Sequence, residues 1–200
     1  MRVALTVFAI LLGLRAPAAA QTVEVTPLAG YRFGNDFFEV VANRPVDLDG
    51  APVVGGMVNV DLGGGLSFEG LFSHQQANVT APGGPFGPPA SWRVVVDQWL
   101  AGGRQEFGSG RARPSLSGLL GLTYFGTAGD HELRFTAGAG GGLRVPLQRR
   151  IGLRLDSRVY ATFLDIDARA GVCGSAGCFV AVHANVVWQA EFTADVVVVF

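Results

Sequence analysis

Residues 188–200, WQAEFTADVVVVF, alternate apolar and polar side chains with a period of two. Because side chains alternate between the two faces of a strand, this stretch predicts a β-strand with one apolar face. The apolar face carries Trp188, Ala190, Phe192, Ala194, Val196, Val198 and Phe200. A strand of this kind with a free edge promotes aggregation, so the sequence favours a sheet that pairs both of its edges.

The same period recurs along the chain and is interrupted by clusters of Gly, Pro and Asp. Eight strands are predicted, at 22–33, 53–62, 65–74, 92–103, 113–126, 132–146, 151–164 and 186–200. Each is close to the ~9–11 residues of a tilted transmembrane strand, and some extend beyond that length. In the fourth strand the period slips between Asp97 and Trp99, which allows a β-bulge there.

The composition is unusual for a soluble domain of 200 residues, with 29 Gly, 14 Phe and only 16% charged residues. Every fixed positive charge is an Arg, since the sequence contains no Lys. After the first few residues no apolar run reaches the ~20 residues that a membrane helix needs. This combination is typical of a membrane sheet in which apolar residues alternate with polar ones.

The first 21 residues, MRVALTVFAILLGLRAPAAAQ, resemble a secretory signal in their order of charges and apolar residues. Arg2 precedes an apolar stretch, and three small residues end at Ala20. We therefore expect a signal peptide at 1–20 and a mature domain at 21–200. The alternative, an anchor helix, is disfavoured because the apolar stretch is short and ends at Arg15 and Pro17. Export and the lack of a basic block argue against a nucleic-acid partner.

The connections alternate in length. Residues 62–66, 105–113 and 146–150 form short turns, whereas 34–52, 74–91 and 165–185 are long and only 126–130 is brief on that side. Outer-membrane barrels have short periplasmic turns and longer extracellular loops. The predicted fold class is therefore all-β, an eight-stranded antiparallel up-and-down transmembrane β-barrel with both termini on the short-turn side.

Alternation alone fits a soluble barrel with an apolar interior as well as a membrane barrel with a polar one. The terminal aromatic strand, the Gly content and the unequal connections favour the membrane barrel. An eight-stranded barrel has room only for side chains, so interior charges must pair and should plug the lumen. The predicted lumen charges are Glu24, Arg32, Asp61, Glu69, Arg93, Asp97, Arg134, Arg144, Arg154, Asp156, Arg158, Glu191 and Asp195.

Three segments resemble a known family. VTPLAGYRFG at 25–34, GAGGGLRVPLQRRIGLRLDSRVYATFLD at 138–165 and the aromatic Phe200 are similar to the small eight-stranded outer-membrane β-barrel proteins. These include the membrane domain of outer membrane protein A and the "outer membrane protein beta-barrel domain" family. The resemblance implies an outer-membrane location and a monomeric barrel that contacts outer-membrane lipid and lipopolysaccharide. We expect no peptidoglycan-binding domain after the barrel, in contrast to the two-domain members of the family, so the resemblance does not imply a cell-wall anchoring role.

In that family the terminal strand resembles the signal that the outer-membrane assembly machinery reads. The signal would map here onto Phe192, Ala194, Val196, Val198 and Phe200.

Other candidate sites are less specific. Cys173 and Cys178 follow an export signal, which favours a disulfide within the last long loop over a metal site. Ser73 and His74 point to opposite faces of their strand, so they form no catalytic dyad. The glycine-rich run at 138–144 matches neither nucleotide-binding pattern, and small residues there would leave room for Arg side chains. We expect no catalytic residue, metal or cofactor.

The sequence therefore predicts an integral outer-membrane barrel with a structural or surface-interaction role and a lumen plugged by paired charges. The alternatives are a narrow channel or transporter for small solutes, a lipid-modifying membrane enzyme and a soluble lipocalin-like carrier. The sequence does not identify the partner of the long loops.

Overall fold

The computed structural model describes residues 22–34, 36–39, 44–81, 90–127, 131–169, 173–174, 177–178 and 181–200. The predicted signal peptide at 1–20 lies outside the described residues. No helix among the described residues combines the length and the hydropathy needed to cross a bilayer.

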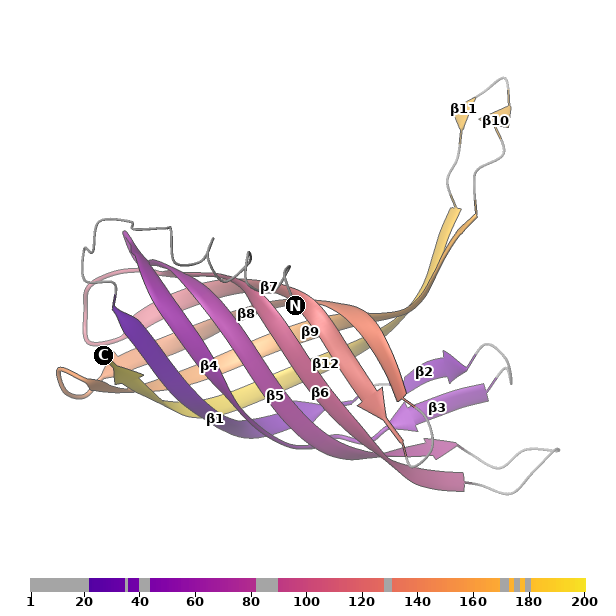
Figure 1. Ribbon diagram of the computed structural model, residues 1–200, viewed down its shortest axis with the longest axis horizontal. Helices are drawn as coiled ribbons and strands as arrows, with labels where there is room; N and C mark the ends of the chain where they lie inside the picture. Colours follow the sequence, from indigo (N-terminus) through magenta and orange to yellow (C-terminus); the bar gives the residue numbers. More distant parts are fainter. Residues whose placement is uncertain are drawn as a thin grey trace, which may run out of the picture.

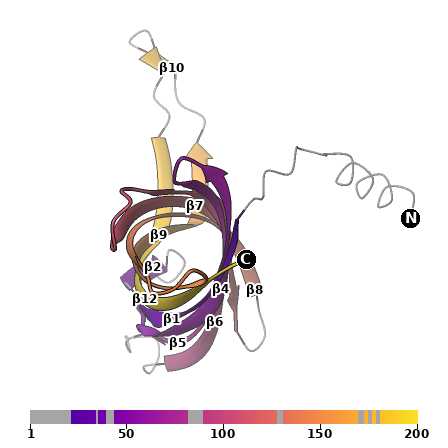
Figure 2. The same cartoon turned by 90° about the vertical axis from the view of Figure 1, so that its left-hand side faces the viewer.

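Eight long antiparallel strands form a closed barrel, as the sequence predicts (Figure 1). They are β1 (Val23–Phe33), β4 (Ala51–Gly63), β5 (Leu66–Ala81), β6 (Ala90–Glu106), β7 (Arg113–Gly126), β8 (His131–Pro146), β9 (Ile151–Arg169) and β12 (Ala181–Val199). Pairing of β1 with β12 closes the ring, which is visible end-on in Figure 2. The terminal strand therefore has a neighbour on each side, β1 and β9.

The register around the barrel determines its width. It can be traced by passing from each residue to its register partner on the next strand, starting at Phe33 on β1. The path returns to β1 at Val23 after Ala190, Val159, Ala139, Gly118, Gly103, Phe68 and Val60. The start and end points, 33 and 23, differ by 10 residues. A displacement of this size over eight strands corresponds to a strand tilt of about 40° and an interior that side chains can fill.

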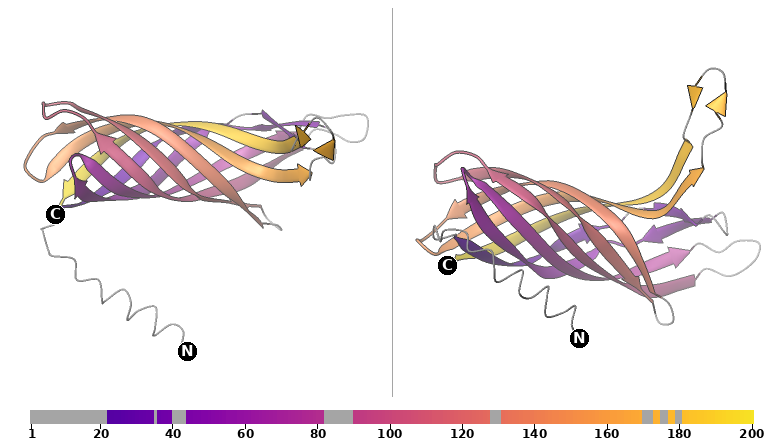
Figure 3. Two further views of the ribbon diagram at one scale, coloured as in Figure 1. Left: turned by 90° about the horizontal axis from the view of Figure 1, so that it is seen from above. Right: turned by 45° about the horizontal axis from the view of Figure 1, so that its top comes forward.

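Several strands extend beyond their predicted ends on the long-loop side. The paired β9 and β12 project from the barrel as a two-stranded ribbon, which carries the short strands β10 (Cys173–Gly174) and β11 (Gly177–Cys178) (Figure 3). The first long loop contains a hairpin, β2 (Asp36–Glu39) and β3 (Arg44–Leu48), whose second strand pairs with β5. On the other side, the tight turn after β4 uses Gly63, Gly64 and Gly65, all with positive φ.

The two faces of the barrel wall have opposite polarity. On β9, Leu153 and Leu155 point outward and are 46% and 58% exposed, whereas Arg154 between them points inward and is 1% exposed. Phe192 and Glu191 on β12 show the same contrast. This is the orientation that the sequence predicts for a membrane barrel, and it is the reverse of a soluble carrier.

The predicted β-bulge in the fourth strand is absent, because β6 pairs with β5 and β7 in continuous register. The slip in the sequence period has another cause. Toward the long loops, the outward residues of β5 and β6 become polar and their inward residues become apolar. The outward Phe72 and Trp99 are followed by the outward pair His74 and Asp97. In the same part of the barrel the inward positions become apolar, with Ala77, Val79, Val94 and Val96 buried. Such an exchange is expected where a strand leaves hydrocarbon for water.

We predict that the cost of an outward charge on β6 depends on its position along the strand. Ala101→Arg lies just below Trp99, inside the hydrocarbon, and should lower the free energy of unfolding by about 1–3 kcal/mol, between the interfacial and the midplane cost of an Arg. Val95→Arg lies on the same face above Asp97 and should change it by about 0–1 kcal/mol. Urea titration of the vesicle-inserted protein, read by gel mobility, measures both. Equal costs would contradict this membrane boundary.

Candidate functional site in the barrel lumen

The central ionic cluster joins opposite walls of the barrel. Arg154 on β9 places Nη2 2.8 Å from Oε2 of Glu69 on β5, which lies four strands away in either direction around the barrel. Arg154 Nε is 2.5 Å from Oδ2 of Asp156, and Arg158 Nη2 donates to the same oxygen at 3.0 Å. Asn59 Nδ2 also donates to Glu69, at 2.9 Å. A carboxylate shared by several donors compensates for its loss of water.

A second cluster lies beside the first. Arg32 on β1 donates to Glu191 on β12 through Nε at 3.0 Å and Nη2 at 2.6 Å. Tyr160 donates its hydroxyl to the other Glu191 oxygen at 3.0 Å, and its ring centre is 5.2 Å from the Arg32 guanidinium carbon. Arg32 Nη2 also donates to Ser73. Arg158 Nη1 is 3.6 Å from Glu191, which links the two clusters.

Buried apolar side chains form two packed groups in the lumen. One buried group contacts the ionic clusters through Met57 and Tyr160. It consists of Leu28, Met57, Leu71, Leu100, Leu119 and Tyr160. A second group occupies the long-loop end and consists of Leu48, Ala51, Ala77, Val79, Val94, Val96 and Val187. The lumen is therefore occupied by ion pairs in its centre and by a packed apolar cap toward the long loops.

Glycines on β8 make room for the ionic side chains of β9. A Cβ atom at Gly140 would lie 2.6 Å from Cγ of Arg158, and one at Gly138 would lie 2.8 Å from the Tyr160 ring. A Cβ atom at Gly142 would overlap the Asp156 carboxylate. The glycine-rich run thus provides space for side chains, which was the interpretation favoured by the sequence.

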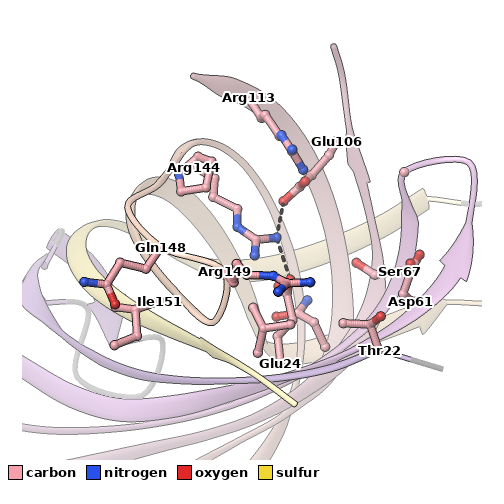
Figure 4. Close-up of a pocket in the computed structure, with 14 residues that line it drawn as sticks. Thr22, Glu24, Asp61, Ser67, Glu106, Arg113, Arg144, Gln148, Arg149 and Ile151 are labelled. Atoms are coloured by element: carbon pink, nitrogen blue, oxygen red, sulfur yellow. Dashed lines mark hydrogen bonds and ion pairs between the residues drawn. The ribbon is translucent and has the colours of Figure 1, made fainter. Parts of the chain in front are cut away.

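A polar vestibule opens at the short-turn end of the barrel (Figure 4). Arg144 Nη1 lies 2.5 Å from Glu24 and 3.3 Å from Glu106, and Arg104 binds Glu106 at 2.8 Å. The cavity has a volume of about 490 Å³. Its lining carries Glu24, Asp61 and Glu106 together with Arg113, Arg144 and Arg149, so its fixed charges balance.

Most of the predicted lumen charges lie inside the barrel. Arg32, Glu69, Arg154, Asp156, Arg158, Glu191 and Asp195 are buried, and Glu24 and Arg144 line the vestibule. Two lie at the rims: Asp61 is exposed and accepts a hydrogen bond from the Gly63 amide, and Arg134 pairs with the exposed Glu132 at 2.9 Å.

The prediction is wrong for Arg93 and Asp97, which lie on the outer face of β6, whereas Val94, Val96 and Gln98 on the opposite face are buried. The assignment failed because the inner face of β6 becomes apolar above the membrane boundary.

Several lumen residues are not among those predicted from the sequence. Arg104 lies between the predicted strand at 92–103 and the predicted turn at 105–113, and Glu106 lies in that turn. Yet Arg104 is 1% exposed and shares the inward face of β6 with Leu100. Extending the predicted strand and its alternation past residue 103 would have placed both Arg104 and Glu106 on the inward face. Tyr160 and Ser73 were missed because an uncharged polar residue gives no sign of a partner on another strand.

The remaining candidate residues stay predictions. β10 and β11 place Cys173 opposite Cys178 in register, which agrees with a disulfide without showing one. Phe192, Ala194 and Val196 point outward on β12, and their role as an assembly signal remains an expectation. Ser73 is buried inside while His74 faces outward, so these two side chains do not meet. The described part of the chain contains no group of three or more His, Cys, Asp or Glu side chains suited to a metal ion.

These features define a closed eight-stranded barrel with an ionic interior and an apolar exterior, the architecture of the small outer-membrane β-barrel proteins. Among solved structures, Neisserial surface protein A is similar at a TM-score of 0.52 and 13% identity, over 90% of this chain and 97% of that chain. At this identity the likeness concerns the fold alone.

Two further solved structures are similar at lower TM-scores. The outer membrane protease OmpT from Escherichia coli has a TM-score of 0.48 and 7% identity, over 92% of this chain and 98% of that chain. The outer membrane protein AlkL has a TM-score of 0.45 and 14% identity, over 94% of this chain and 95% of that chain. The sequence matches no protein-family model and no curated protein.

We predict that the central cluster is critical for stability. Glu69→Gln removes the carboxylate that lies 2.8 Å from Arg154 and 3.6 Å from Arg158, and it should lower the free energy of unfolding by about 3–5 kcal/mol. Glu132→Gln removes the partner of Arg134 at the exposed rim and should cost less than about 1 kcal/mol. Urea unfolding in vesicles compares them, and similar costs would show that the buried pair contributes no more than a surface pair.

A second prediction concerns the glycines of β8. Gly142→Val should displace Asp156 from its two Arg partners and reduce the yield of folded barrel several-fold. Gly141→Ala is the matched control, because a Cβ atom there meets its nearest neighbour, the Ser115 carbonyl oxygen, at an ordinary 3.5 Å. The fraction that migrates as folded barrel on an unheated gel measures both. Normal folding of Gly142→Val would refute the role assigned to the glycine.

Proposed function

We propose that this protein is an integral barrel of the bacterial outer membrane, with a closed lumen and a structural or surface-interaction role. The observation that carries the proposal is the filled lumen. The Glu69–Arg154 pair crosses it, and an apolar cap occupies its long-loop end. A solute would have to separate buried ion pairs, which costs several kcal/mol for each pair.

The apolar exterior supports the membrane location. Outward Leu120, Leu155 and Trp188 are each more than half exposed, which in water would be unfavourable but in lipid is expected. The fold shared with Neisserial surface protein A is consistent with this location. In this proposal the chain is exported by a cleaved signal peptide, inserted by the outer-membrane assembly machinery and surrounded by outer-membrane lipid as a monomer.

The parts outside the bilayer are the candidates for interaction. The β9–β12 ribbon extends well beyond the barrel, and the β2–β3 hairpin lies at the same end. Loops carried on a rigid scaffold commonly bind partners. The proposal assigns no catalytic step, since Ser73 and His74 lie on opposite sides of the wall.

Planar-bilayer recording tests the closed lumen. The inserted wild-type protein should give no stable single-channel steps at either polarity, whereas a channel would give them reproducibly. The double variant Glu69→Met/Arg154→Met removes one charge of each sign and keeps the lumen filled, and it should also be silent. If the wild type gives single-channel conductance steps, and their size or ion selectivity changes in this variant, ions pass through the lumen. That result would refute the proposal.

A further inference from the structure

The outer face of β5 and β6 carries a polar stripe, which we define as His74, Gln76 and Asn78 on β5 with Arg93 and Asp97 on β6. The register places His74 opposite Asp97 and Asn78 opposite Arg93. Asp97 and Arg93 are the only formally charged side chains on the outer face of the barrel wall, as far as the structure describes its side chains.

The stripe begins directly above an aromatic pair. The rings of Phe72 and Trp99 face outward with centroids 4.3 Å apart, and the next outward register pair is His74 with Asp97. Aromatic side chains collect at membrane interfaces, whereas a carboxylate facing hydrocarbon is unfavourable. The edge of the hydrocarbon therefore lies between these two pairs, and the stripe faces the headgroups of the outer leaflet.

The stripe has one cation, Arg93, that an anionic ligand can bind. His74 Nδ1 lies 2.6 Å from Asp97 Oδ1, so the carboxylate already has a partner. His74 Nε2 lies 3.4 Å from the Gln76 amide nitrogen, which can donate to it and leaves the amide oxygen of Gln76 available. Arg93 lies four residues from Asp97 on the same strand, about 13 Å away and too far to pair with it. Its exposed guanidinium can therefore bind a phosphate.

The length of the stripe indicates which lipid fits. Arg93 lies six residues beyond Trp99, which at a tilt of about 40° is roughly 15 Å along the membrane normal. A phospholipid headgroup layer is only about 5–8 Å thick. A lipid with a phosphorylated saccharide headgroup extends farther, and its hydroxyl groups match the amides of Gln76 and Asn78.

We infer that the polar stripe binds the phosphorylated saccharide headgroup of a lipopolysaccharide, with Arg93 on a phosphate and Phe72 and Trp99 against the lipid below. This inference rests on the proposed membrane location and adds a specific lipid site to it.

Native mass spectrometry of the full-length protein in detergent tests the inference with three lipids: lipopolysaccharide, its enzymatically dephosphorylated form and phosphatidylglycerol. The wild type should bind lipopolysaccharide in preference to the other two. Arg93→Gln should weaken that binding at least about tenfold, the effect of losing one charge-assisted hydrogen bond. Arg111→Gln is the matched control, because Arg111 is exposed at the opposite rim, and its binding should equal the wild type.

Equal weakening by Arg93→Gln and Arg111→Gln would overturn the site. Equal binding of dephosphorylated lipopolysaccharide would overturn phosphate recognition, and equal binding of phosphatidylglycerol would overturn the saccharide assignment. Carbonate extraction of the vesicle-reconstituted protein separates this inference from the proposed function. Release of the protein by carbonate would refute both, whereas a retained protein without an Arg93 effect would refute only the lipid site.

Discussion

Closure of the sheet through β1 and β12 is the constraint on which the rest of this structure depends. A bilayer offers no hydrogen bonds, so every backbone amide and carbonyl group within it must pair inside the protein. Closing eight strands with a register displacement of 10 residues fixes the tilt and the width of the lumen. The resulting interior is too narrow for bulk water, and side chains must fill it.

That geometry explains the interior chemistry. A charge in a narrow lumen loses hydration, so each Arg needs a carboxylate at short range, on its own strand or on another. Arg154 and Glu69 meet because β9 and β5 lie opposite each other, and the β8 glycines leave room for the large side chains of β9. The charged interior and the apolar exterior are thus two consequences of one closed wall in lipid.

Much of this arrangement could be predicted from the sequence, and the failures have a physical pattern. The strand at 113–126 was predicted with the observed bounds because its alternation holds throughout. Arg93 and Asp97 were wrongly assigned to the lumen because, in the part of β6 that lies in water, the polar residues face outward and the apolar residues face inward. Arg104 was missed because it lies beside a turn. The pairing of Glu69 with Arg154 depends on the barrel register, which no local pattern contains.

The central claim is that the apolar face meets lipid and the charged face lines the lumen. Nuclear Overhauser contacts between side-chain methyl groups and lipid acyl chains, measured in nanodiscs, test it most directly. The account predicts contacts from the methyl groups of Leu153, Leu155 and Val159 and none from those of Leu28, Leu71 and Leu119. Acyl-chain contacts from the second group in place of the first would contradict it.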